Sequence, residues 1–173
     1  MLAASGNLDM KPIHGSIVAK VGNGNVGRGI TIPKNALEDV THRSVYLPIV
    51  RNHLPEFLRV FDFAEPSMVK GNRDVTTVPT QALYLMNNPF VLKQSRNLAR
   101  ILVDKDHLTS GERIELAYKL ALSRTPTAFE AIRSLTYLKT FQERQAKGAS
   151  PELNALASLC HALFSVAEFR YLN

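Results

Sequence analysis

Two prolines ten residues apart, Pro79 and Pro89, constrain the fold of this chain more than any other feature. The proline ring fixes φ and removes the backbone N–H, and both properties suit the first turn of a helix. Thr77 and Gln81 flank the first proline and are residue types whose side chains can satisfy unpaired N–H groups in that turn. Asn88 is a good N-cap for a helix that begins at the second proline. These residues therefore predict a structural joint at which one helix ends and another starts in a new direction.

Further helices are indicated by apolar side chains at helical spacing and by N-terminal capping patterns. Residues 54–61 carry a one-sided apolar stripe, with Pro55 in the first turn and Asn52 or His53 as the cap. Thr-x-x-Glu patterns at Thr109 and Thr127 predict two more helix starts. The apolar residues that the helices after Pro79 carry toward a core are Ala82, Leu83, Leu85 and Met86; Phe90, Leu98, Ile101 and Leu102; Ile114, Ala117, Tyr118 and Ala121; Ile132, Leu135 and Leu138; and, in a last helix from residue 150, Leu153, Leu156, Ala157, Cys160, Leu163 and Phe164.

Residues 12–33 have the clearest β signature in the chain. Two β-prone runs, 17–21 and 30–32, are separated by a glycine-rich loop at 22–29. The loop contains Gly-x-Gly-x-x-Gly, but a dinucleotide site needs a helix after it, and here β-branched residues and Pro33 follow. A hairpin is the better interpretation. A further short strand or extended segment is expected at 43–48.

The predicted fold is mainly α: a compact bundle of five or six helices with a small N-terminal β-hairpin. Residues 1–40 are expected to form a helix end and the hairpin, packed on the rest or on a missing upstream region, and residues 41–173 the helical domain. The first residues resemble the tail of a helix and lack the pattern of a signal peptide, so we expect Met1 to lie inside a longer chain.

Composition excludes some classes of function. The chain has 173 residues and 45% hydrophobic residues, and no apolar run approaches the length of a membrane span. The net charge of +6 is spread along the sequence, with nine Lys/Arg against seven Asp/Glu in residues 1–80 and 12 against eight in residues 81–173. A basic run with exposed aromatic residues, as nucleic-acid binders show, is missing, so that function is disfavoured. One cysteine excludes an internal disulfide.

Five blocks of sequence resemble the planctomycete cytochrome-c-associated C-terminal domain, a family of unknown function. The resemblance extends over about residues 43–173, while residues 10–40 depart from it. It implies a largely helical domain at the end of a longer, exported bacterial protein, periplasmic or extracellular, with a haem-binding cytochrome c domain upstream. It supplies no catalytic residues. The blocks are RSVYLP (43–48), RNHLPEFLRVFDFAEPS (51–67), TTVPTQALYLMNNPFV (76–91), RIELAYKLALSRTPT (113–127) and LASLCHALFSVAEFRYLN (156–173).

No cofactor or metal is expected in this chain. Covalent haem attachment needs Cys-x-x-Cys-His, and the sequence offers only Cys160 followed by His161. Cys160 lies on an apolar helical stripe, where a small hydrophobic residue is the ordinary explanation. The five histidines are far apart and show no metal-ligand spacing. No nucleophile elbow is present.

One group of polar residues is the best candidate for a ligand-binding site. Arginines provide planar forks that suit carboxylates or sulfates, and amides beside them could bind sugar hydroxyls. The favoured interpretation is structural, with arginines paired to Asp62 or Asp74 and amides satisfying the backbone at the joint. The alternative is a small anion or carbohydrate site. The residues are Arg43, Arg51, Asn52, His53, Arg73, Asp74, Gln81 and Asn87.

The leading functional hypothesis is a non-catalytic accessory or interaction domain whose partners are the upstream domains of its parent protein. The alternative is part of an enzyme or binding module that acts on polysaccharide or sulfated glycan. General acid–base catalysis would need two converging carboxylates. Asp62, Glu65 and Asp74 are the clustered acids near the joint, and the sequence does not show that they converge.

Overall fold

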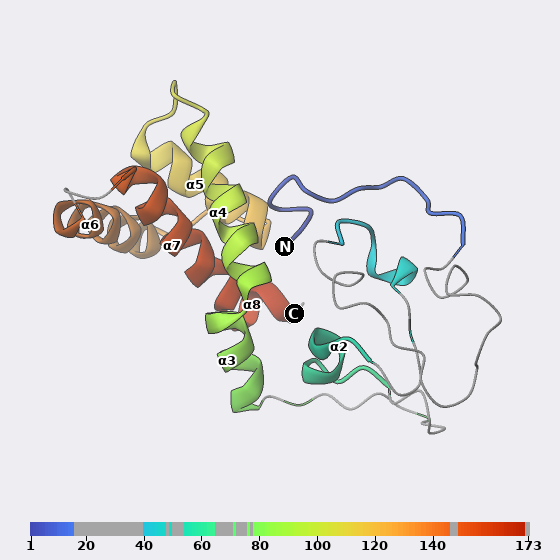
Figure 1. The fold of residues 1–173 in the computed structure, drawn as a ribbon. Helices are drawn as coiled ribbons and strands as arrows, with labels where there is room; N and C mark the ends of the chain where they lie inside the picture. Colours follow the sequence, from blue (N-terminus) through green and yellow to red (C-terminus); the bar gives the residue numbers. More distant parts are fainter. Residues whose placement is uncertain are drawn as a thin grey trace. The chain divides into compact units, whose positions relative to one another are not determined.

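The computed structural model describes residues 1–15, 40–47, 49, 54–64, 71, 76, 78–145 and 149–171. These residues are mainly helical, as predicted, and they contain no strand; a single isolated bridge joins Asp9 and His42. Figure 1 shows the helices in chain order. The described elements are a 3₁₀ turn, η2 (Ser44–Tyr46), followed by α2 (Glu56–Val60), α3 (Pro79–Asn87), α4 (Pro89–Val103), α5 (Ser110–Leu122), α6 (Ala128–Arg144), α7 (Pro151–Ser165) and α8 (Ala167–Arg170).

The chain divides into two units, and each is described by itself. The helical unit consists of Met1–Asn7 and Leu85–Asn173, and the second unit of Leu8–Tyr84. The domain boundary expected between residues 40 and 41 stays a prediction. The glycine-rich loop at 22–29 and most of the expected hairpin lie outside the described residues.

Helix α7 is the centre of the helical unit. It packs against α4, α5, α6 and α8, and Figure 1 shows it running between α4 and α6. A helix with neighbours on several sides must be apolar around much of its circumference. Its sequence meets this requirement, because two adjacent faces are buried and both are apolar or small. Its buried residues are Ala155, Leu156, Leu159, Cys160, Leu163 and Phe164.

Most of the predicted helix starts are confirmed where the structure describes them, whereas α2 begins at Glu56 with Pro55 as its N-cap, later than the start expected from a cap at Asn52 or His53. Helix α3 begins at Pro79, and α4 begins at Pro89 with the Asn88 Oδ1 atom accepting from the Phe90 N–H at 2.9 Å. Both capping boxes are formed: the Thr109 N–H donates to Glu112 Oε2 at 2.8 Å, and α6 repeats the arrangement with Thr127 and Glu130. These contacts are local, so a few residues of sequence suffice to specify them.

Residues 2–6 form a hydrogen-bonded turn. The Asn7 N–H donates to the Leu2 carbonyl at 2.9 Å, and the Gly6 N–H donates to the Ala3 carbonyl at 3.2 Å. Gly6 has φ of +70°. Together these are the two hydrogen bonds and the left-handed residue of a Schellman C-cap, for which glycine is the usual choice.

Several expectations about exposure and extended structure were wrong. Residues 44–46 form a 3₁₀ turn, with the Tyr46 N–H bonded to the Arg43 carbonyl, so the strand predicted at 43–48 is not formed there. In α3 only Leu85 of the expected apolar set is buried, while Leu83 and Met86 are exposed. In α6 Leu138 is buried, whereas the other two expected residues, Ile132 and Leu135, are exposed.

Candidate functional site

Most of the predicted polar site lies outside the described residues. Arg51, Asn52, His53, Arg73 and Asp74 belong to that part of the chain, as does Thr77 of the joint. Of the three that are described, Arg43 and Asn87 are exposed and Gln81 is buried. The proposed site therefore stays a prediction.

Gln81 links two elements of the second unit. Its side chain is 2% exposed, and Nε2 donates to the Val60 carbonyl at 3.1 Å and to Asp62 Oδ2 at 3.4 Å. The same carboxylate accepts from the Thr76 N–H at 2.8 Å. The backbone of Asp62 is in the left-handed region, with φ of 57°, and this residue follows the last turn of α2. A buried amide that satisfies the end of a helix in this way has a structural role.

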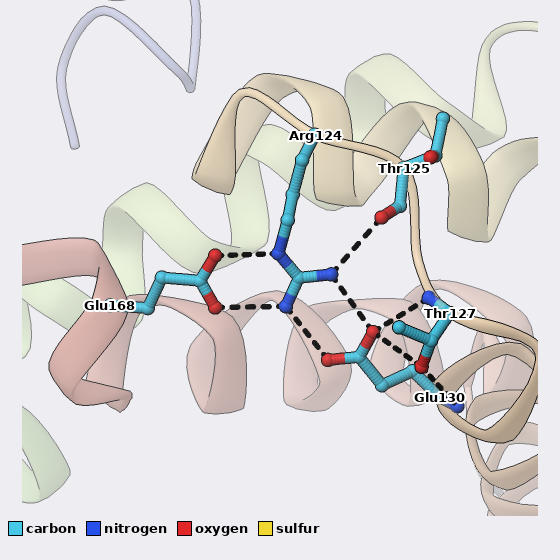
Figure 2. Close-up of polar contacts among 5 residues, drawn as sticks. All are labelled: Arg124, Thr125, Thr127, Glu130 and Glu168. Carbon is cyan, nitrogen blue, oxygen red and sulfur yellow. Dashed lines mark hydrogen bonds and ion pairs between the residues drawn. The ribbon is translucent and has the colours of Figure 1, made fainter. Parts of the chain in front are cut away.

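A charged cluster surrounds Arg124, just after α5, and Figure 2 shows its contacts. Nε and one terminal nitrogen of Arg124 bind the Glu168 carboxylate at 2.5 and 2.8 Å. Both terminal nitrogens bind Glu130 at 2.9 and 2.8 Å, and one donates to the Thr125 carbonyl at 3.0 Å. The guanidinium lies 5.5 Å from the centre of the Tyr118 ring. Sequence analysis missed Arg124 and Glu168 and assigned Glu130 only to its capping box.

These contacts shift the pKa values of the three charged groups, Arg124, Glu130 and Glu168. Hydrogen bonds from Arg124 lower the pKa of Glu130 to about 2, with the Thr127 backbone N–H assisting. The same guanidinium lowers the pKa of Glu168. The hydrogen bonds to Glu168 and then to Glu130 raise the pKa of Arg124 above its ordinary value. All three groups are therefore charged at neutral pH.

The Arg124 cluster has little capacity to bind a ligand. A guanidinium has five N–H donors, and the five contacts to Glu168, Glu130 and Thr125 account for them. Glu130 also accepts from the Thr127 N–H at 2.7 Å. The cluster fixes the end of α5 to the start of α6 and to α8, so its role is to join helices.

A second arginine, Arg113, connects the start of α5 with the end of α4 and with the start of α7. Arg113 is buried and forms an ion pair with Glu152 at the start of α7. It also donates to the carbonyls of Val103 and Lys105 at 3.4 and 3.2 Å, which lie at the end of α4. The Val103 carbonyl belongs to the last turn of α4, where basic side chains commonly satisfy backbone carbonyls, whereas the Lys105 carbonyl also accepts from the Leu108 N–H at 3.0 Å.

An open groove lies between α4 and α7. It has a volume of about 510 Å³. Its polar side chains belong to both helices: the Arg96 guanidinium lies 3.5 Å from Asn154 Oδ1, and Ser158 Oγ lies 2.6 Å from the Tyr137 hydroxyl. The His161 Nε2 atom lies 2.8 Å from the Leu85 carbonyl oxygen. The lining residues are Leu92, Lys93, Ser95, Arg96, Asn154, Ala157, Ser158 and His161.

The described residues contain no group of three or more His, Cys, Asp or Glu side chains placed to hold a metal ion. No helix among them has both the length and the apolar character needed to cross a bilayer.

Comparison with known proteins gives one match. The model of the family PSD1, described as a protein of unknown function (DUF1553), matches residues 1–138. The match includes residues 10–40, which the resemblance noted from sequence left out, and it overlaps that resemblance over residues 43–138. No curated protein and no solved structure matches the chain.

Proposed function

We propose that this chain, which belongs to the PSD1 family of proteins of unknown function (DUF1553), serves as a non-catalytic accessory domain that holds other parts of a larger protein. The observation that supports the proposal is the position of residues 1–7. They belong to the same unit as residues 85–173, although the 77 residues between them form a unit of their own. The helical unit therefore binds a segment that is remote in sequence.

The contact is specific because it is polar and buried. Ser5 Oγ donates to Gln94 Oε1 at 2.7 Å, and Asn7 Nδ2 donates to the same oxygen at 2.8 Å. Ser5 is 2% exposed and Gln94, on α4, is 3% exposed. A buried amide left without partners is costly, so such a pair favours one register of the segment on the helix.

The wider context of the proposal comes from the resemblance described above. In that context the chain is the C-terminal part of an exported planctomycete protein, and a cytochrome c domain precedes it. Any haem would belong to that preceding domain. In this proposal the helical unit receives the end of the preceding region through residues 1–7 and α4.

Calorimetry of the chain alone and of the chain preceded by its native upstream domains tests the proposal. We expect the upstream domains to raise the melting temperature of this domain, since a partner that binds the native state stabilises it. Gln94→Leu should reduce that gain, whereas Gln145→Leu, at an exposed position after α6, should leave it unchanged. An equal melting temperature with and without the upstream domains would overturn the proposal.

A further inference from the structure

Helix α4 carries a row of basic side chains. Its sequence contains three basic residues, Lys93, Arg96 and Arg100, and no acidic residue. Their spacing of three and four residues places them on one stripe of the helix, and all three are exposed. The opposite side of α4 is buried against the helical unit, with Leu98 and Leu102 fully covered.

The partners of Arg96 and Arg100 distinguish them from Arg113 and Arg124. Arg113 and Arg124 each bind carboxylates. In the described part of the chain Arg96 instead contacts the neutral Asn154 at 3.5 Å, and Arg100 contacts the neutral Asn97 at 3.1 Å. Exposed arginines with neutral partners retain their full charge and most of their donors.

The groove beside this stripe has one cationic edge and one neutral wall. Lys93 and Arg96 form the edge on α4, and Arg100 continues it one turn further along the helix. Asn154 and Ser158 on α7 form the wall and can donate hydrogen bonds. Leu92, which is 45% exposed, and Ala157 provide apolar surface.

We propose that the α4–α7 groove is a docking site for an acidic peptide segment of a partner protein. Carboxylates of that segment pair with Arg96 and Arg100, and an apolar side chain rests on Leu92 and Ala157. The inference deepens the proposed function, because it names a recognition surface of the accessory domain. Charge complementarity selects the occupant: bidentate Arg–carboxylate pairs suit carboxylates spaced one helical turn apart. A single-stranded nucleic acid fits less well, because none of the described residues that line the groove is a phenylalanine, tyrosine or tryptophan on which bases could stack.

Fluorescence anisotropy with a labelled amphipathic peptide rich in glutamate and leucine tests this proposal on the full chain. We expect binding that persists at physiological ionic strength and that weakens as salt is added. The double variant Arg96→Glu/Arg100→Glu should lower the affinity by about tenfold or more, since it replaces attraction with repulsion at the site. The matched control, Arg133→Glu/Lys139→Glu, makes the same change in net charge at exposed positions of α6 and should retain binding. Circular dichroism verifies that both variants are folded.

Three outcomes would overturn the inference. One is the absence of peptide binding by the wild type at physiological ionic strength. Another is an equal loss of affinity in both double variants, which would show non-specific attraction by net charge. The third is tighter binding of a sulfated oligosaccharide or single-stranded DNA than of the peptide. A failure of the groove inference can be distinguished from a failure of the proposed function. If the peptide does not bind but the upstream domains still raise the melting temperature, only the assignment of the groove is wrong.

Discussion

Nε of Arg124 lies 2.5 Å from Oε1 of Glu168, a residue 44 positions later in the chain. The same guanidinium binds Glu130, the residue that caps α6. One side chain thus connects the end of α5 with the start of α6 and with the four-residue helix α8 (Figure 2). A helix this short has little stability of its own, so its position depends on such contacts.

Replacing Arg124 by lysine should destabilise the helical unit. Lysine keeps the charge but has no planar fork, so it cannot bind two carboxylates in bidentate fashion. Because the site is partly exposed, we expect a loss of only about 1 kcal/mol in the free energy of unfolding. Urea denaturation of the variant and of the wild type measures this loss in the free energy of unfolding. Arg144→Lys, at an exposed position at the end of α6, is the matched control; an equal effect of both variants would contradict a special role for Arg124.

The free energy of unfolding should fall when the pH is lowered through the range in which the carboxylates with lowered pKa values take up protons. The pKa of Glu130 is about 2 in the folded protein against an ordinary value of 4.5, so the folded state binds the proton less readily than the unfolded state. The stabilising contribution is therefore complete above pH 4.5 and is lost between about 4.5 and about 2. Denaturation curves recorded across this pH range test the expected loss of stability. Glu130→Gln keeps a capping acceptor but removes the charge, and it should reduce the dependence on pH.

Gly6→Ala should destabilise the chain for two reasons. Gly6 has φ of +70°, which is strained for alanine, and an added Cβ would lie 3.1 Å from Ile101 Cδ1. We expect a loss of about 1 kcal/mol or more in the free energy of unfolding. Gly15→Ala separates the two causes, because Gly15 has φ of +84° and no atom within 4 Å of the added Cβ. Adding Ile101→Val, which removes Cδ1, should restore only the steric part; complete restoration would show that backbone strain is negligible.

Cys160 should be unreactive in the folded protein. Burial raises the pKa of its thiol to about 12, so the nucleophilic thiolate is scarce at neutral pH. A thiol reagent of the aromatic disulfide type should label the native chain very slowly at pH 8 and label it at once in concentrated urea. Rapid labelling without urea would indicate that α7 opens readily, which contradicts its place at the centre of the helical unit.

The helix starts were predictable from sequence because the interactions that set them are local. Thr109 with Glu112, Thr127 with Glu130, and Asn88 with Pro89 each act within one turn, so the residue types alone indicate the structure. Gln81 was predicted at the joint only from its neighbours in the chain, whereas its partners, Val60 and Asp62, lie about 20 residues earlier. The remaining arginines and amides of the predicted polar site still await a test.

By itself the sequence determined that the chain is mainly helical and where its later helices begin. The tertiary structure alone decided that Arg124 binds Glu168, that Arg113 binds Glu152, and that Ser5 binds Gln94 across 89 positions. It also decided that Ile132 is exposed although its spacing suits a buried stripe. The physical reason is that capping and helical periodicity depend on neighbours along the chain, whereas burial and ion pairing depend on which helices pack together, and no local pattern records that choice.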